Sequence, residues 1–557
     1  MGEMNNDAKR AGRLLAPLSL AGLFVGILFF AISLSPSLIP RNFLVQGALS
    51  GVSASVGYFM GWILGWSTGF LEVSFPPKKF ARPVKITLFA GLAILVAVFL
   101  WRLTIWQESI RGLMGMETLD AGYSLWVALV ALAVAALLIT LARLFIKLQA
   151  SIARRFGQIV PVRLAFLLSM FLALLIVFSA ADNLLVRQLM SAADEIFADL
   201  DAVVPDGFTQ PTDPDIPGSE ASLVGWDDIG RRGKYFVLDG PRQADIAAFN
   251  SGEAKRPIRV YVGLGYGETL EERAELALAE LIRVKAFERS VLIVATPTGT
   301  GWLDPGGVDT VEYLHGGDTA IVSMQYSYLP SWMTLIVEPE KSSKSARSLF
   351  KQVYAHWKTL PKDNRPKLYL HGLSLGALGS EASAQLFLML EDFIQGAVWS
   401  GSPFPSQMWA AMTAAREPGS PAWLPRFGDG SLARFTAQKN ALKSYGDRWG
   451  PIRMVYIQYA SDPMVFFSPT LLYRRPDWLV GKRGPDVSPY FEWYPVVSFL
   501  QVGFDMILST SVPIGHGHNY SASNYIDAWL EVTAPSGWTP DRVDQLKTNF
   551  KPTTLKP

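Results

Sequence analysis

The amino-acid sequence predicts an all-α transmembrane bundle over residues 1–182 and, over residues 223–557, an α/β domain whose mostly parallel sheet carries helices on both faces. The chain has 557 residues, of which 50% are hydrophobic and 18% are charged, a composition too apolar for an ordinary soluble protein of several domains. Long apolar stretches lie only in the first third. After residue 223, short β-branched runs alternate with amphipathic helical patterns, which is typical of a covered parallel sheet.

About five spans are expected in the bundle, because a helix of about 20 apolar residues crosses the hydrocarbon core. The apolar stretches lie near 14–36, 44–70, 86–104, 122–143 and 164–181. The first follows Lys9, Arg10 and Arg13, as a signal peptide would. It lacks a small-residue cleavage pattern before Pro36 and further spans follow it, so we interpret it as an uncleaved span.

The orientation follows from the basic residues, which are retained on the cytoplasmic side of a membrane. The N-terminal segment and the loops around 78–85 and 143–163 are rich in lysine and arginine, whereas the two intervening loops hold only Arg41 and Arg111. Acidic residues prevail after the fifth span. We therefore expect the N-terminus in the cytoplasm and everything after about residue 182 outside it.

The second span carries glycines at four-residue spacing, which leave one helical face bare enough for close helix contact: Gly57, Gly61, Gly65 and Gly69. Three interpretations stay open: packing inside the bundle, a substrate groove, or a seam through which the chain forms a homo-oligomer. No Asp, Glu, Lys or His lies in the middle of a span, which argues against an ion-coupled transporter.

The overall charge excludes one class of partner and the cysteine count excludes several chemistries. The net charge is +2 and no basic run with interleaved aromatic residues occurs, so we expect no nucleic-acid binding. The chain has no cysteine, which excludes disulfides, cysteine nucleophiles and thiolate metal sites. Between bundle and α/β domain, residues 183–222 are expected to form an amphipathic connector followed by a linker rich in Pro, Asp and Gly.

The α/β domain is predicted from six strand-like runs and the helical patterns between them. The runs are RVYVGL, SVLIVAT, AIVSMQY, KLYLHGL, GAVWSG and RMVYIQYAS. The helix candidates include ETLEERAELALAELIRV, SARSLFKQVYAHWKTL, SEASAQLFLMLEDF and a late SNYIDAWLEV.

One junction, LYLHGLSLGALGS, places Ser374 between the strand KLYLHGL and a helix. A serine on a tight strand-to-helix turn, with small residues two positions away on each side, is the arrangement called a nucleophile elbow. Gly372 and Gly376 supply these small residues. The backbone N–H of Leu375, at the helix start, is then a candidate donor to an oxyanion.

A serine needs a base and an orienting acid, which in this arrangement follow it in the order Ser, acid, His. Of the five histidines only His516 and His518 come after Ser374, so we predict His518 as the base with His516 as the alternate. The predicted acid is Asp462, at the end of RMVYIQYAS, although an Asp-Pro pair also commonly starts a turn. The earlier His371 and His356 are interpreted as structural.

No cofactor or metal is expected. A His-x-His pair resembles part of a metal site, but no third ligand is grouped with His516 and His518. The second oxyanion donor is expected from Thr298, Gly299 or Thr300, in a glycine-rich loop after an earlier strand that could otherwise be merely flexible. The stretch GLGYGE lacks the third glycine of a dinucleotide-binding loop and is interpreted as a turn.

Several separated motifs occur in the order in which they occur in a known family: RVYVGL, TPTGTGWLDP, QYSYLPSW, LHGLSLGALGSEA, RRPDWL, RGPDVSPYFEWYP and VPIGHGHNY. The chain resembles the bacterial alpha/beta-hydrolase family 9 membrane proteins, loosely in the membrane part and closely over residues 220–535. The resemblance implies an α/β-hydrolase fold with Ser374 as nucleophile. Members tend to have an acidic residue before the serine, where this chain has Leu373, which leaves the elbow intact and alters the polarity beside it.

The combined expectation is a serine hydrolase held in the bacterial inner membrane, with its catalytic domain on the periplasmic side. Aromatic stretches such as QYSYLPSWM and PYFEWYPVVSFL could line an acyl pocket or form ordinary packing. We expect membrane lipids as partners and an ester or acyl bond of a lipid or acylated envelope component as substrate. Two alternatives remain: a lipid transacylase that uses the same acyl-enzyme, and a hydrolase fold that serves as a scaffold or binding module without catalysis.

Overall fold

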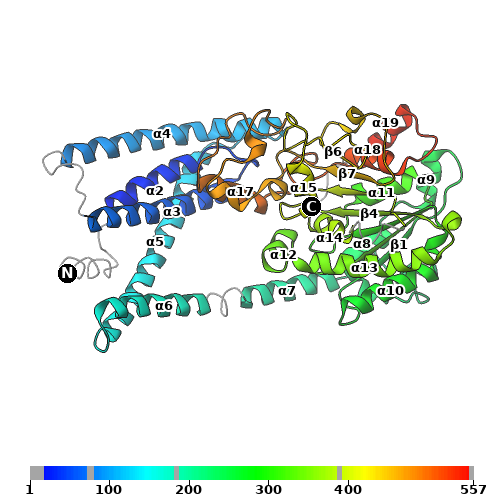
Figure 1. The fold of residues 1–557 in the computed structure, drawn as a ribbon, viewed down its shortest axis with the longest axis horizontal. Helices are drawn as coiled ribbons and strands as arrows, with labels where there is room; N and C mark the ends of the chain where they lie inside the picture. Colours follow the sequence, from blue (N-terminus) through cyan, green and yellow to red (C-terminus); the bar gives the residue numbers. More distant parts are fainter. Residues whose placement is uncertain (1–17, 72–80, 181–186, 385–391, 551–557) are drawn as a thin grey trace. The chain divides into compact units, whose positions relative to one another are not determined.

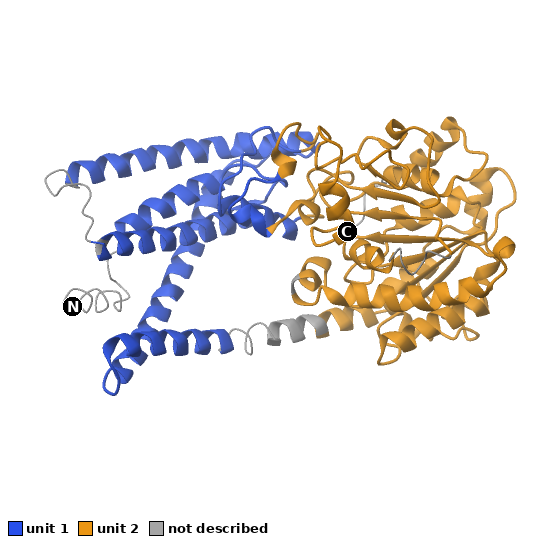
Figure 2. Ribbon diagram, in the orientation of Figure 1, with its two compact units in different colours: residues 1–192, 469–476, 487–508 blue, residues 193–468, 477–486, 509–557 orange. Residues whose placement is uncertain are grey.

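The structure is a computed structural model that describes residues 18–71, 81–180, 187–384 and 392–550. It divides into two compact units, shown in Figure 2. Unit 1 comprises residues 1–192, 469–476 and 487–508, and unit 2 comprises residues 193–468, 477–486 and 509–557. The prediction divides the chain into consecutive parts at 182 and 223. In the structure, unit 1 also includes two segments from the C-terminal half, 469–476 and 487–508.

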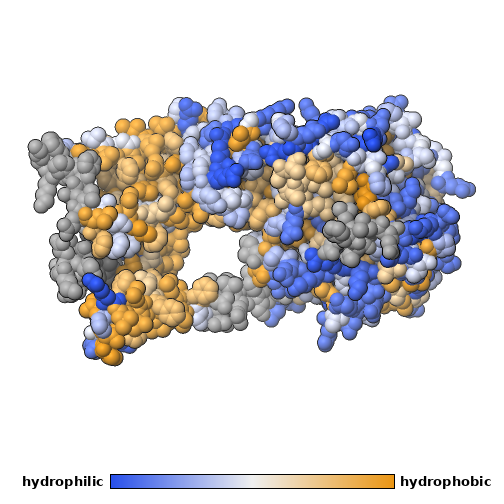
Figure 3. Space-filling model, in the orientation of Figure 1, coloured by the Kyte–Doolittle hydropathy of each residue, from blue (hydrophilic) through white to orange (hydrophobic). Residues whose placement is uncertain are grey.

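Unit 1 is built from long apolar helices (Figure 1): α2 (Leu20–Ser33), α3 (Phe43–Phe70), α4 (Ala81–Leu113), α5 (Tyr123–Phe156) and α6 (Val162–Ala180). Within the described residues, four of them, α3 to α6, are long and apolar enough to cross a membrane. Helix α2, at the first predicted span, has 14 described residues and ends where the Ser- and Pro-rich segment around Pro36 begins. Many large apolar side chains on these helices are exposed, as expected of surfaces that face lipid (Figure 3).

The glycines of α3 serve close packing inside unit 1. A Cβ atom at Gly61 would lie 2.4 Å from the carbonyl oxygen of Ala21 in α2, and one at Gly57 would lie 2.7 Å from the ring of Phe29. On another part of the helix, a Cβ at Gly51 would lie 2.7 Å from a backbone oxygen of α5. Side chains at these positions would push the helices apart. Bundle packing therefore accounts for these glycines, and the homo-oligomer stays a prediction.

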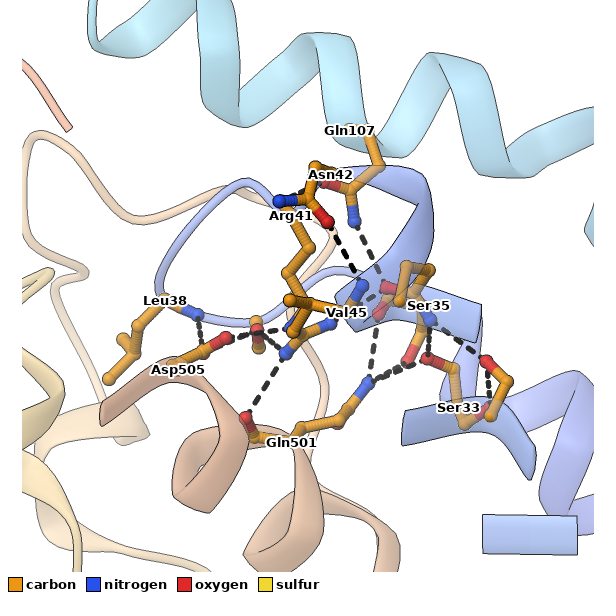
Figure 4. Close-up of polar contacts among 12 residues, drawn as sticks. Ser33, Ser35, Leu38, Arg41, Asn42, Val45, Gln107, Gln501 and Asp505 are labelled. Atoms are coloured by element: carbon orange, nitrogen blue, oxygen red, sulfur yellow. Dashed lines mark hydrogen bonds and ion pairs between the residues drawn. The ribbon is translucent and has the colours of Figure 1, made fainter. Parts of the chain in front are cut away.

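A helix from the C-terminal half, α17 (Val497–Ile507), completes unit 1 and carries a buried acid into it. The Asp505 carboxylate forms an ion pair with Arg41, from the segment between α2 and α3, over 2.7 Å, and both side chains are fully buried (Figure 4). The same carboxylate accepts hydrogen bonds from the Ser37 hydroxyl at 2.6 Å and the Leu38 N–H at 3.1 Å. The aromatic run PYFEWYPVVSFL, which leads into α17, thus belongs to unit 1.

Unit 2 contains a seven-stranded, all-parallel sheet in the order β1-β3-β2-β4-β5-β7-β6. The strands are β1 (Ile258–Val262), β2 (Val291–Thr296), β3 (Thr319–Met324), β4 (Lys367–Leu373), β5 (Gly396–Ser400), β6 (Ala433–Thr436) and β7 (Arg453–Ile457). Nearly every strand residue is buried, because helices cover both faces (Figure 1). Six of these strands match the predicted runs, and β6 was not predicted.

Helices connect the parallel strands of the sheet. Because such crossovers are right-handed, the direction in which the chain moves across the sheet decides which face the helix covers. Helices α10 (Leu270–Arg283), α13 (Glu340–Thr359) and α14 (Leu375–Ser383) lead in one direction across the sheet and pack together on one face. Helix α11 (Pro305–Leu314) leads in the opposite direction, from β2 back to β3, and packs with α18 (Ala522–Thr533). The direction of winding thus reverses between the neighbouring strands β2 and β4, and open α/β sheets bind ligands beyond the carboxyl ends of strands at such a point.

The predicted connector contains α7 (Arg187–Ala202), and the predicted linker packs on unit 2. Asp213 and Asp215 form ion pairs with Arg256, and the Ser222 hydroxyl donates to Glu280 over 2.7 Å. Several shorter helices complete unit 2: α8 (Gly230–Leu238), α9 (Gln243–Asn250), α12 (Ser331–Val337), α15 (Gln407–Ala414), α16 (Pro463–Phe466) and α19 (Pro540–Asn549).

Candidate active site

Ser374 occupies a strained turn between β4 and α14. Its backbone has φ 60° and ψ −129°, outside the regions that L-residues other than glycine normally adopt. The Ser374 N–H donates to the carbonyl oxygen of Ser400, at the end of β5, over 3.0 Å. Strand pairing on one side and the helix start on the other hold the residue in this conformation, as the predicted nucleophile elbow requires.

The glycines on either side of Ser374 are required by close backbone contacts. A Cβ atom at Gly372 would lie 2.3 Å from the carbonyl oxygen of Gly376. A Cβ at Gly376 would lie 2.2 Å from the carbonyl oxygen of Thr296, at the end of β2. The elbow is therefore pressed against the β2 loop, at the point where the sheet reverses its winding direction.

Asp462 and His518, which are 56 residues apart in the chain, meet in the interior of unit 2. The Oδ2 atom of Asp462 lies 2.7 Å from Nδ1 of His518, and the exposed fractions of the two side chains are 0% and 7%. Asp462 also caps α16, since its Oδ1 accepts the N–H of Met464 over 2.9 Å. Asp462 therefore starts a turn, as an Asp-Pro pair commonly does, and its other carboxylate oxygen contacts the imidazole of the predicted base.

Two residues that the sequence did not single out support this pair. The hydroxyl of Tyr520, which is buried, donates to Oδ2 of Asp462 over 2.7 Å. Gly401 follows β5 with φ 56°, and a Cβ there would lie 2.5 Å from Cε1 of His518. Because Gly401 directly follows the residue that binds the Ser374 N–H, this contact places the imidazole beside the elbow.

The two atoms that would exchange a proton have no hydrogen-bond partner among the described residues. They are the hydroxyl oxygen of Ser374 and Nε2 of His518, and both are buried. The structure thus brings the predicted acid and the predicted base together and shows no hydrogen bond between Ser374 and His518. Such bonds are often long or poorly aligned without substrate, and buried polar atoms without partners call for an explanation beyond packing.

The predicted oxyanion loop follows β2, as expected, and two of its N–H groups are engaged. The N–H of Thr298 donates to the carbonyl of Trp302 over 2.9 Å, and that of Gly299 donates to the Ser331 hydroxyl over 3.0 Å. Each would have to give up this partner to bind an oxyanion. Leu375 begins α14, where the first N–H groups have no acceptor within the helix, so its predicted role and that of Thr300 stay predictions.

The alternate base, His516, belongs to a second Asp–His pair. Its Nδ1 lies 3.2 Å from Oδ2 of Asp486, and the His516 side chain is 21% exposed. Asp486 was not foreseen, because nothing in the spacing of RGPDVSP relates it to a histidine thirty positions later. Tyr520 did leave a signal, since it lies two positions after His518 in the same motif.

The other histidines have structural surroundings. The Nδ1 atom of His371 lies 2.8 Å from the carbonyl oxygen of Val398, and burial lowers the pKa of this imidazole to about 4. Burial also lowers the pKa of His315 to about 4, while its Nε2 lies 2.9 Å from the Thr533 hydroxyl. His356 packs against the ring of Phe287 at a centroid distance of 4.5 Å.

A parallel α/β sheet with a strained serine at the carboxyl end of a central strand, a buried acid after a later strand and a histidine in the loop before a late helix are typical of the α/β-hydrolase fold. Comparison with family models agrees: the model described as "Alpha/beta-hydrolase family" matches residues 258–546, and that of the "Alpha/beta-hydrolase family N-terminus" matches residues 34–241. The chain belongs to this alpha/beta-hydrolase family. Comparisons with curated proteins and with solved structures gave no match.

Proposed function

We propose that the protein is a membrane-anchored serine hydrolase in which Ser374, His518 and Asp462 form a catalytic triad. The main support is a strained, buried serine and a buried imidazole, each of which has a reactive atom without a partner among the described residues. The other nitrogen of the imidazole is held by a carboxylate, and its carbon Cε1 approaches Gly401, the residue after the one that binds the Ser374 N–H. This distribution of bonded and unbonded atoms is what nucleophilic catalysis needs.

In the proposed reaction, Oγ of Ser374 attacks an acyl carbonyl while Nε2 of His518 takes its proton. The developing oxyanion is stabilised by the N–H of Leu375 and by an N–H of the loop 298–300. The imidazolium returns the proton to the leaving alcohol, and water repeats the cycle on the acyl-enzyme. Asp462 stabilises the imidazolium through its hydrogen bond to Nδ1.

The substrate class proposed is an ester or acyl bond of a lipid or of an acylated envelope component. The support is that the same chain carries a large membrane unit, more than a simple tether needs, together with the hydrolase unit. The charge pattern of the loops supports a location in the inner membrane with unit 2 on the periplasmic side.

Labelling with a fluorophosphonate tests the enzymatic part of this proposal. The full-length protein in detergent is expected to label, and Ser374→Ala is expected to abolish both labelling and hydrolysis of a p-nitrophenyl ester. A loss of several orders of magnitude is typical when a nucleophile is removed. Wild-type protein that is folded but does not label would instead favour the scaffold alternative.

The absence of cysteine makes the location testable. A single cysteine at the exposed Asp429 is expected to react with a membrane-impermeant thiol reagent in intact spheroplasts. Reaction only after lysis would place unit 2 in the cytoplasm and reverse the proposed orientation.

A further inference from the structure

A third acidic residue, Asp486, lies beside the proposed acid–base pair without belonging to it. Its side chain is 2% exposed, and its Oδ2 atom accepts three hydrogen bonds. The donors are Nε2 of Gln438 at 2.6 Å, the Ser461 hydroxyl at 2.6 Å and Nδ1 of His516 at 3.2 Å. One carboxylate oxygen thus gathers groups from three segments of unit 2 that are remote from one another in the chain.

These three donors come from the segments that set the geometry of the site. Gln438 follows the edge strand β6, and Ser461 follows β7 and directly precedes the acid Asp462. His516 stands two positions before the base, His518. Asp486 therefore binds the acid-bearing and the base-bearing segments at the same point.

A second hydrogen bond closes the link between the two segments. The Ser461 hydroxyl, which donates to Asp486, accepts the N–H of Gly517 over 2.8 Å. Gly517 has φ 55°, a left-handed conformation that suits glycine, and directly precedes His518. A continuous path of hydrogen bonds thus runs from Asp486 through Ser461 to the residue beside the base.

The cost of burying this carboxylate suggests that it has a purpose. A buried carboxylate is destabilising unless hydrogen bonds or a cation compensate it, and no lysine or arginine is paired with Asp486 among the described residues. Its other oxygen, Oδ1, is buried and has no partner in the same part of the chain.

We propose that Asp486 is a positioning residue that fixes Asp462 and His518 at hydrogen-bonding distance by clamping the segments 461–462 and 516–518 together. Asp486 does not itself contact the reacting atoms. This inference rests on the proposed function, because positioning has a measurable consequence only if the pair performs acid–base catalysis.

The test compares Asp486→Ala with Asp486→Asn in the full-length protein. Alanine removes the clamp, whereas asparagine keeps an acceptor oxygen for Ser461 and His516. Asp486→Ala is expected to lower kcat for a p-nitrophenyl ester and the rate of fluorophosphonate labelling by about 10- to 100-fold, with KM changed less than about twofold, since small misplacements of catalytic groups act on the chemical step. Asp486→Asn should restore the rate to within about fivefold of wild type.

A matched control and a second variant keep the result interpretable. Asp363→Ala removes an exposed aspartate of unit 2 and should leave both rates unchanged. Should Asp486→Ala fail to fold, Ser461→Ala takes its place, because it removes only the link between Asp486 and Gly517 and is expected to lower kcat by about tenfold.

Wild-type labelling rates in the folded Asp486→Ala or Ser461→Ala variant would overturn the inference, as would an Asp486→Asn variant as slow as alanine. These outcomes leave the proposed function intact provided that wild type labels at Ser374. Failure of wild type to label is a different result, and it would remove the proposed function itself.

Discussion

Both units bury an aspartate against a basic partner, and the two pairs differ in what they leave unbonded. In unit 1, both oxygens of Asp505 and all three guanidinium nitrogens of Arg41 have partners (Figure 4). In unit 2, Asp462 is fully bonded, but Nε2 of His518 and the hydroxyl of Ser374 are buried without partners among the described residues. An ion pair whose charged atoms are all bonded stabilises the fold, whereas a pair with an unbonded reactive atom leaves that atom available for chemistry.

The largest expected effect separates the two histidines of unit 2. His518→Ala should lower kcat by about 10⁴-fold, because the base is lost, while His516→Ala should lower it by no more than about tenfold. Single-turnover hydrolysis of a p-nitrophenyl ester measures both. Equal losses of kcat in the two variants would contradict the assignment of His518, and not His516, as the base.

Substitutions in the Arg41–Asp505 ion pair of unit 1 should change the stability of the protein instead. Asp505→Ala leaves the Arg41 guanidinium buried without its counter-ion, and breaking such a pair costs about 3–5 kcal/mol. The double variant Arg41→Met/Asp505→Leu should cost less than this single change, because it buries no lone charge. Denaturant unfolding in detergent micelles measures both, with the exposed Glu117→Ala as control.

A result in the other direction would break the comparison. If Asp505→Ala left the denaturation midpoint unchanged and abolished kcat of the folded protein, the network in unit 1 would be part of the catalytic machinery.

A buried acid on α14, Glu381, is expected to make the stability of the protein depend on pH. Glu381 accepts the N–H of Trp409 over 3.2 Å, and burial raises its pKa from 4.5 to about 7. Below about pH 4 the carboxyl is protonated in both folded and unfolded chains. As the pH rises towards 7 the unfolded chain ionises first, so wild type loses stability, and the loss corresponds to at most about 3 kcal/mol.

Glu381→Gln should remove this pH dependence. The variant is expected to be more stable than wild type above pH 7 and to lose the difference below about pH 4.5, as measured by thermal unfolding across that range. A constant difference at every pH would show that ionisation of Glu381 is not its cause.

The smallest effect is expected from Tyr520, which contacts Asp462 of the Asp462–His518 pair. Tyr520→Phe removes one hydrogen bond to Oδ2 of Asp462 and leaves the bond from His518, so kcat should fall by about three- to tenfold, equivalent to roughly 1 kcal/mol. KM for the same ester should stay constant. A loss as large as that of His518→Ala would mean that Tyr520 acts on the substrate.

The sequence predicted the parts of the fold whose signals are local. The five other predicted strands and β4 with its elbow are short runs of apolar, β-branched residues bounded by glycine or polar positions. Strand β6 escaped because it has four residues and contains Arg434. That side chain is fully buried, with its guanidinium 3.9 Å from the ring centroid of Trp449 and bonded to backbone carbonyls.

Features that depend on contacts between distant residues could not be predicted from the sequence. The membership of α17 in unit 1 depends on Arg41, which lies 464 positions from Asp505. The clamp at Asp486 similarly joins segments that no periodicity relates. The contact between Asp462 and His518 was within reach of the sequence, because the order Ser, acid, His limits the choice of base to two late histidines; their catalytic role stays a prediction.

The most direct test of the account is the site and rate of fluorophosphonate attachment, mapped by mass spectrometry of the full-length protein. We predict a single adduct on Ser374 in wild type, attachment at the same residue with a rate within about tenfold of wild type in His516→Ala, and a rate reduced by orders of magnitude in His518→Ala. An adduct on another residue, or undiminished attachment without His518, would contradict the claim that these buried, unbonded atoms form the catalytic pair.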